Sequence, residues 1–167
     1  MQATSHQQPA VKSRRSRAKH HAGVGGVVAV SVALMALVFG HNLGNAGLQS
    51  ASAQAGFHAS LPGDLPAGFS QHKLDSGPGV VAIDFRSNSD DRGYSITQKA
   101  SAWNSTDLRQ AFVAPADSQY QTVASAGKTI YLYGQQNATW IKDGVWYLVQ
   151  TEGVLSDRQL IQLATSS

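Results

Sequence analysis

Residues 138–150 read ATWIKDGVWYLVQ and contain the strongest fold signal in this chain. Two runs rich in β-branched and aromatic residues, 138–141 and 145–150, lie on either side of the dipeptide Asp143-Gly144. Asp-Gly between such runs is typical of a two-residue hairpin turn, because both central positions of that turn need a positive φ. The stretch therefore predicts a β-hairpin.

Alternation of apolar and polar residues predicts further strands earlier in the chain. Residues 80–86 place an apolar residue at every second position, and 94–99 follows them after a polar turn. A second pair of strands, 120–125 and 128–133, is separated by Ala-Gly, and a short strand is expected at 69–74. Strands joined by such short turns predict an antiparallel sheet.

Two segments have a helical period instead. The first is capped by Asn104 or Ser105, places apolar residues on one face and is expected to stop at Pro115. Ser156 and Gln159 form a capping box that opens the second helix. Hairpins covered by two packed amphipathic helices predict a small α+β domain with an antiparallel sheet.

The N-terminal part has a different character. Residues 1–21 hold five Lys or Arg and no acidic residue, whereas residues 22–40 are apolar and uncharged. A helix over 22–40 would rise about 28 Å, close to the hydrocarbon thickness of about 30 Å. The next Lys or Arg after this run is Lys73, so the basic residues near the run all lie on its N-terminal side. This charge asymmetry predicts a single transmembrane helix over 22–40 in the cell membrane, with the basic tail in the cytoplasm and the C-terminal part outside it.

Residues 41–60 are small and polar and show no period, so we expect a flexible stalk that leads to a domain over 61–167. A cleaved signal peptide is the alternative, because Ala51 and Ala53 fit the small-x-small pattern before Gln54. That position lies far past the apolar run, and the run is longer than a signal core. An uncleaved anchor is therefore favoured.

The net charge of +3 is unevenly distributed. Five of the 13 Lys and Arg lie in residues 1–21, so the remaining eight oppose ten Asp and Glu and give the rest of the chain a net charge of −2. The predicted domain thus has no basic bias toward nucleic acid. The chain has no cysteine, which excludes disulfides and thiol chemistry.

Motifs that carry chemistry are sparse. Ser70 and Lys73 match the Ser-x-x-Lys pattern of penicillin-interacting serine enzymes, but no companion motif follows, and the domain is small for that fold. Of six histidines only His72 lies in the predicted domain, without metal-ligand spacing. We therefore predict no catalytic residues, no cofactor and no metal site.

Aromatic residues gather in the C-terminal strands. Tyr131 and Tyr133 share one strand face, Trp146 and Tyr147 take opposite faces, and Trp140 lies across the Asp-Gly hairpin. Cross-strand packing in a core explains most of this pattern. On an open sheet face, however, Tyr131, Tyr133, Trp140 and Trp146 would form a binding surface for a peptide, glycan or lipid chain.

The predicted domain resembles, over about residues 61–167, the family catalogued as domain of unknown function 4367. The motifs that carry the resemblance are the turn Leu65-Pro-Ala-Gly-Phe69, the strands 80–85, 94–98, 138–140 and 144–147, and the closing segment 155–166. Members often follow a single membrane span, and some belong to proteins that resemble anti-sigma factors. This chain lacks the zinc-bearing sigma-binding part, so the resemblance implies no anti-sigma role, and it supplies no catalytic residues.

Together these features predict a non-enzymatic, membrane-anchored bacterial domain that binds or senses something outside the membrane. Its partners would be the membrane, through 22–40, and an unknown protein, peptide or envelope ligand, but not nucleic acid. One alternative is a carrier or chaperone-like domain for lipid or extended peptide. A less favoured alternative is a small cell-wall hydrolase that uses Ser70 and Lys73.

Overall fold

The computed structural model describes residues 45–167, so the predicted basic tail and transmembrane helix lie outside the described residues. The strands are β1 (Phe69–Gly77), β2 (Val80–Ser87), β3 (Gly93–Ala100), β4 (Gln121–Ser125), β5 (Lys128–Tyr133), β6 (Asn137–Lys142) and β7 (Val145–Gln150). The helices are α1 (Asn45–Ala55), α2 (Ser105–Leu108), the π-helix η1 (Arg109–Val113), α3 (Ala114–Ala116) and α4 (Asp157–Ser166). Because α2, η1 and α3 follow one another without a break, we call them together the 105–116 helix. Within 45–167 no helix is long and apolar enough to cross a membrane.

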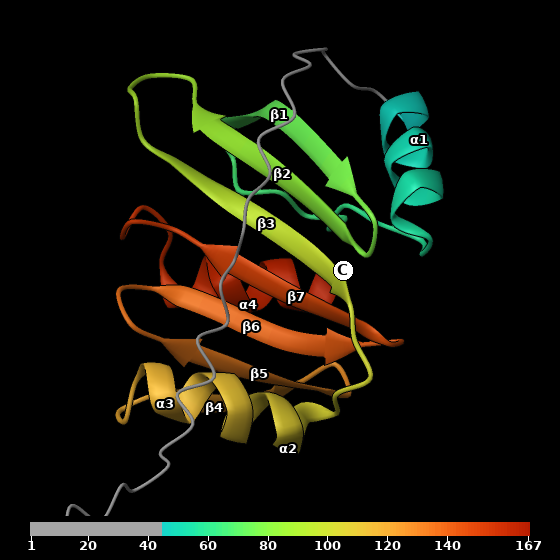
Figure 1. Ribbon diagram of the computed structural model, residues 1–167. Helices are drawn as coiled ribbons and strands as arrows, with labels where there is room; N and C mark the ends of the chain where they lie inside the picture. Colours follow the sequence, from blue (N-terminus) through green and yellow to red (C-terminus); the bar gives the residue numbers. More distant parts are fainter. Residues whose placement is uncertain (1–44) are drawn as a thin grey trace, which may run out of the picture. The chain divides into compact units, whose positions relative to one another are not determined.

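The strands form one antiparallel sheet in the order β1-β2-β3-β7-β6-β5-β4 (Figure 1). Two meanders, β1–β3 and β4–β7, meet where β3 pairs with β7, and the 105–116 helix connects them. The predicted α+β class and all the predicted hairpins are confirmed.

Two tight turns explain the hairpins of the second meander. Asp143 and Gly144 have φ of 50° and 75°, and Ala126 and Gly127 have φ of 48° and 73°. Positive φ at both central residues defines the turn whose twist matches that of the flanking strands. The dipeptides between the strand runs therefore set the register of β4 with β5 and of β6 with β7.

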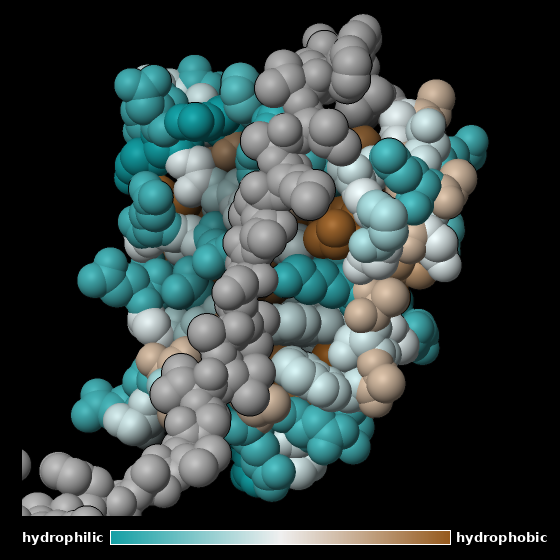
Figure 2. Space-filling model, viewed as in Figure 1, coloured by the Kyte–Doolittle hydropathy of each residue, from teal (hydrophilic) through white to brown (hydrophobic). Residues whose placement is uncertain are grey.

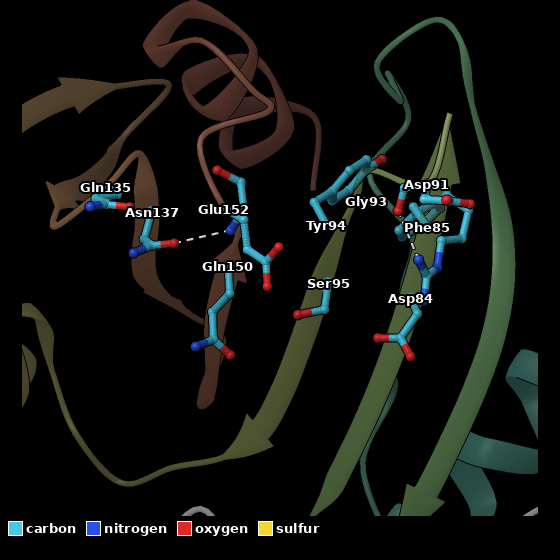
Figure 3. Close-up of a pocket in the computed structure, with 12 residues that line it drawn as sticks. Asp84, Phe85, Asp91, Gly93, Tyr94, Ser95, Gln135, Asn137, Gln150 and Glu152 are labelled. Atoms are coloured by element: carbon cyan, nitrogen blue, oxygen red, sulfur yellow. Dashed lines mark hydrogen bonds between the residues drawn. The ribbon is translucent and has the colours of Figure 1, made fainter. Parts of the chain in front are cut away.

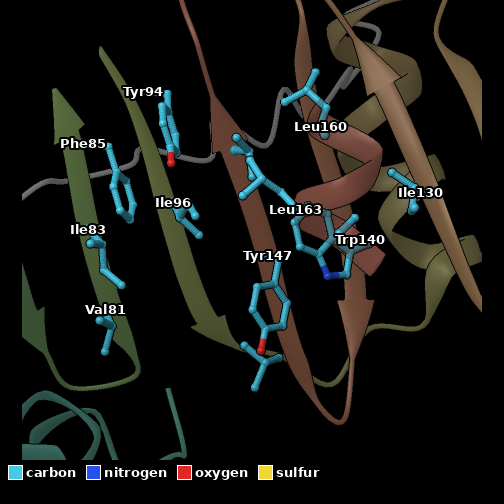
Figure 4. Close-up of a cluster of buried hydrophobic side chains, with 14 of the residues drawn as sticks. Val81, Ile83, Phe85, Tyr94, Ile96, Ile130, Trp140, Tyr147, Leu160 and Leu163 are labelled. Carbon is cyan, nitrogen blue, oxygen red and sulfur yellow. The ribbon is translucent and has the colours of Figure 1, made fainter. Parts of the chain in front are cut away.

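One face of the sheet, the core face, packs against α1 and α4 (Figure 4). Two pairs of aromatic rings stack there, Phe85 on Tyr94 with centroids 4.6 Å apart and Trp140 on Tyr147 with centroids 5.2 Å apart. Helix α4 contributes the fully buried Leu163. This layer holds most of the apolar surface that the described part of the chain buries.

The opposite face, the outer face, is only partly covered. Leu108 and Val113 of the 105–116 helix are buried against Tyr131 and Trp146 of β5 and β7. Over β1, β2 and β3 the outer face carries polar residues, and Figure 2 shows hydrophilic side chains gathered around the β2–β3 loop. The sheet therefore has one closed face and one half-open face.

The predicted flexible stalk over 41–60 is wrong for the residues that the structure describes. Helix α1 packs against β1 and β2, with Ala51 and Ala55 only 2% and 6% exposed. Their small side chains let the helix approach the sheet closely. In the sequence, however, alanines among polar residues do not form the apolar stripe that predicts an amphipathic helix. Tertiary packing stabilises this helix, and the folded domain includes residues 45–60.

The predicted stop of the first helical segment at Pro115 is also wrong, although its cap at Asn104 is confirmed. The helix widens into a π turn, in which the Ala114 amide donates to the carbonyl of Arg109. Pro115 then lies at the start of the short α3, where a missing N–H is tolerated, and the helix ends at Ala116.

A buried amide fastens the segment after α1 to the centre of the sheet. Gln98 of β3 is fully buried, and its Oε1 accepts from the Ser60 amide at 3.0 Å. Its Nε2 donates to the Ser60 carbonyl at 2.7 Å, and the hydroxyls of Ser60 and Tyr147 lie 3.2 Å apart. Gln98 thus satisfies both backbone groups of Ser60, as a neighbouring strand would do.

We predict that Gln98→Ala lowers the free energy of unfolding by about 3 kcal/mol, because it leaves a cavity and two unpaired backbone groups. Urea denaturation followed by circular dichroism measures the change. The control is Gln162→Ala on the exposed surface of α4, with an expected change of at most about 0.5 kcal/mol. Equal effects of the two substitutions would contradict the role of Gln98.

Candidate binding site

The four aromatic residues predicted as a binding surface do not form one. Tyr131 and Trp146 are 4% and 5% exposed beneath the 105–116 helix, while Trp140 lies on the core face and is fully buried. Tyr133 is half-buried and contacts Phe112 edge to face, with ring centroids 5.5 Å apart. These residues belong to the two cores, so the predicted aromatic surface is wrong.

An aromatic cluster marks where the covered half of the outer face ends. Trp103 and Phe112 lie against Trp146, with ring centroids 5.3 Å and 4.9 Å away. The Lys99 ammonium lies 5.2 Å from the centroid of the Trp146 ring, and burial lowers the pKa of Lys99. Beyond Lys99, toward β2 and β1, the helix no longer covers the strands.

Ser70 and Lys73, the residues of the hydrolase alternative, are each engaged elsewhere. The Ser70 hydroxyl donates to Asn88 Oδ1 at 2.7 Å, and Lys73 Nζ pairs with Asp75 Oδ2 at 2.6 Å. The hydrogen bond with Asp75, helped by the charges of Asp75 and Asp84, raises the pKa of Lys73. A general base needs the opposite shift, so this geometry does not support nucleophilic catalysis.

The uncovered half of the outer face contains a groove of about 670 Å³, which we call the outer groove (Figure 3). It lies where β2, β3 and β7 end beside the loop between β5 and β6. Its lining consists of Asp84, Phe85, Arg86, Asp91, Gly93, Tyr94, Ser95, Gln135, Asn137, Gln150, Thr151 and Glu152.

Strand register positions the floor of the outer groove. Asp84 lies opposite Ser95 across β2 and β3, and Ser95 lies opposite Gln150 across β3 and β7. Residues directly opposite one another point to the same face of a sheet. Their side chains therefore form one row across three strands, which Lys73 of β1 extends opposite Asp84.

Three of the lining side chains are already bonded, among them Thr151, whose hydroxyl donates to the carbonyl of Gln136 at 2.6 Å. Arg86 Nη1 donates to the carbonyl of Asp91 at 2.8 Å, and Asn137 Oδ1 accepts from the Thr151 amide at 3.0 Å. The lining side chains whose polar groups make no hydrogen bond within residues 45–167 are Asp84, Asp91, Ser95, Gln135, Gln150 and Glu152, together with the buried hydroxyl of Tyr94. The carboxylates, the amides and the Ser95 hydroxyl can bind a ligand that offers both donors and acceptors.

The charge of the outer groove is slightly acidic, because three carboxylates (Asp84, Asp91 and Glu152) face one guanidinium, that of Arg86. In the described part of the chain no group of three or more His, Cys, Asp or Glu is arranged to hold a metal ion. The arrangement is therefore suited to hydrogen-bonded recognition of a polar molecule.

Comparisons with protein-family models, with curated proteins and with solved structures found no match for this chain. The resemblance to the domain of unknown function 4367 family therefore rests on the quoted motifs alone.

Tyr94 has an unusual environment at the end of the outer groove. Its ring stacks on Phe85, but its hydroxyl is buried without a hydrogen-bond partner in residues 45–167, and burial raises its pKa. Tyr147 has a similar place in the core, stacked on Trp140, but its hydroxyl contacts Ser60. The two residues form a natural pair for comparison.

We predict that Tyr94→Phe raises the free energy of unfolding by about 1 kcal/mol at pH 7, because it removes an unpaired buried hydroxyl. The folded protein holds the Tyr94 pKa above the unfolded value of about 10, so wild-type stability falls as pH rises past that value, and the variant should lose less. Urea denaturation at pH 7 and pH 11 measures both effects. Tyr147→Phe is the control and should destabilise; a loss of stability in Tyr94→Phe would contradict the prediction.

Proposed function

We propose that this protein is a non-enzymatic, membrane-anchored extracytoplasmic domain that binds a polar envelope ligand in the outer groove. The observation that carries the proposal is the row of polar side chains across β2, β3 and β7 that make no hydrogen bond within residues 45–167. Solvent-facing strand residues are ordinary, but a hollow that brings several such groups together is suited to a ligand rich in hydroxyl or amide groups.

The anchor part of the proposal rests on the sequence of residues 1–40. The uncharged run 22–40 and the basic flank before it favour a single span with the N-terminus in the cytoplasm. Since α1 begins at Asn45, only residues 41–44 would connect the span to the domain. Four residues reach at most about 14 Å, so the proposed tether is short.

The place of α1 in the domain favours an uncleaved anchor. Cleavage before Gln54 would remove Ala51 from the core, together with Ser52, whose hydroxyl accepts from the Ala59 amide at 3.0 Å. The domain would then lose most of the helix that packs on β1 and β2. Retention of the N-terminal segment keeps this layer intact.

The carrier alternative has one observation in its favour. A hollow of about 510 Å³ lies between α1 and the segment after it, and Leu48, Ala59 and Leu61 supply its apolar lining. The interior between the sheet and its helices, where a lipid carrier would hold a chain, is filled by buried side chains. The outer groove therefore supports the binding function better.

A photoreactive amino acid at Gln150 tests the proposed function in cells that make the full chain. We expect irradiation to attach an envelope component at this position and not at the control position Gln162, which lies on α4 across the sheet. The double substitution Asp84→Ala/Glu152→Ala should remove the adduct and change the melting temperature little, because neither side chain makes a hydrogen bond within residues 45–167 and Lys73 keeps its ion pair with Asp75. The same adducts at both positions, or an adduct insensitive to the double substitution, would refute binding in the outer groove.

The proposed topology has its own test, since the chain contains no cysteine. We expect Ser89→Cys, in the exposed β2–β3 loop, to react with a membrane-impermeant maleimide in intact cells, and Gln7→Cys to react only after lysis. The intact mass of the purified protein should include Ala51 and everything before it. Labelling at position 7 in intact cells, or a mature chain that starts at Gln54, would contradict the anchor.

A further inference from the structure

The two edges of the sheet differ in how they are protected. A free strand edge presents unpaired N–H and C=O groups, and proteins usually block it with charges, bulges or a covering element. The β1 edge has all three: a bulge between Gln71 and Lys73, the Lys73–Asp75 ion pair, and α1 packed against the strand. In addition, the Ser76 hydroxyl bonds to the side chain of Gln54 in α1.

Within residues 45–167 the β4 edge has none of these devices. Residues 118–127 (SQYQTVASAG) contain no charged residue and no proline, and the pairing of β4 with β5 has no bulge. Thr122 and Ala124 are exposed, so the 105–116 helix does not cover the outer face of this strand. The strand ends at a tight turn, and its pairing with β5 stays in register up to that turn.

Backbone geometry shows which groups of β4 are free. Ser125 and Lys128 flank a two-residue turn and therefore form a pair that exchanges both hydrogen bonds. Because bonded and non-bonded pairs alternate along antiparallel strands, Val123 also bonds to β5. The N–H and C=O groups of Thr122 and Ala124 consequently point away from the sheet.

We propose that β4 pairs with β4 of a second copy of this chain, antiparallel and around a two-fold axis at Val123, so that one sheet runs through both copies. In this register Thr122 of each copy lies opposite Ala124 of the other, and their outward backbone groups form the hydrogen bonds. The two Val123 residues face each other in a non-hydrogen-bonded pair, with Cα atoms about 4.5 Å apart.

Charge favours a second copy as the occupant. Around this axis every residue of β4 lies opposite another uncharged residue of β4, so no like charges meet across the interface. The edge is therefore complementary to itself, and the inference does not depend on the proposed ligand or anchor.

A single cysteine tests the register directly, because the full chain has none of its own. With the full chain in detergent solution under mild oxidation, we expect Val123→Cys to form a disulfide-linked dimer in most molecules. The distance across the axis fits a disulfide, whose Cα atoms lie about 4.4–6.8 Å apart. The matched control is Ser70→Cys on the β1 edge, which is exposed and should give at least tenfold less dimer.

Light scattering of the chain without cysteine supplies the second measurement. We expect a dimer for the wild type and a monomer for Ala124→Pro, whose ring replaces an outward N–H that β5 does not use. Thr122→Lys, which adds a charge to the edge, should also give a monomer with an unchanged circular dichroism spectrum, so the test survives if the proline variant fails to fold. A wild-type monomer, equal cross-linking at positions 70 and 123, or a disulfide from position 123 to another protein would overturn the inference.

Discussion

The two hydrogen bonds between the buried amide of Gln98 and the backbone of Ser60 are the constraint on which the arrangement of this domain depends. Gln98 belongs to β3, the strand that joins the two meanders through β7. A buried amide is costly unless its polar groups are paired, so its position requires the Ser60 segment to lie against the sheet. The same contact holds α1 over β1 and β2, and it thereby determines which face of the sheet becomes the core face.

The unequal coverage of the two sheet faces follows from this arrangement. With α1 and α4 both on the core face, only the 105–116 helix remains for the outer face, and its contacts lie on β5, β6 and β7. The first meander must therefore expose one face to solvent, which explains why Asp84 and Ser95 alternate with buried residues. The outer groove is thus a consequence of how the helices are distributed.

Much of the fold was predictable because the signals are local. Period-two runs and the Asp143-Gly144 turn specify hairpins within a few residues, and the Ser156 capping box specifies the start of α4. Helix α1 was not predictable, because Ala51 and Ala55 acquire their apolar role only by close approach to the sheet. The outer groove was not predictable either, because it depends on the pairing of β3 with β7, and the 105–116 helix and strands β4 to β6 separate these two strands in the sequence. The prediction of an aromatic binding surface failed for a related reason. The spacing of the aromatic residues shows which of them share a sheet face, but it does not show whether a helix covers that face.

Pairing at β4 would have a consequence for the outer groove. The two-fold axis between antiparallel strands of one sheet is perpendicular to that sheet, so it keeps both core faces on one side and both outer faces on the other. The two outer grooves would then open in the same direction, with α1 and the protected β1 edges at the far ends of the combined sheet. Two sites that face one way can bind repeating units of one polymer, and the second binding event becomes intramolecular. A repeating envelope polymer would therefore gain avidity from the dimer, whereas a small monovalent ligand would not.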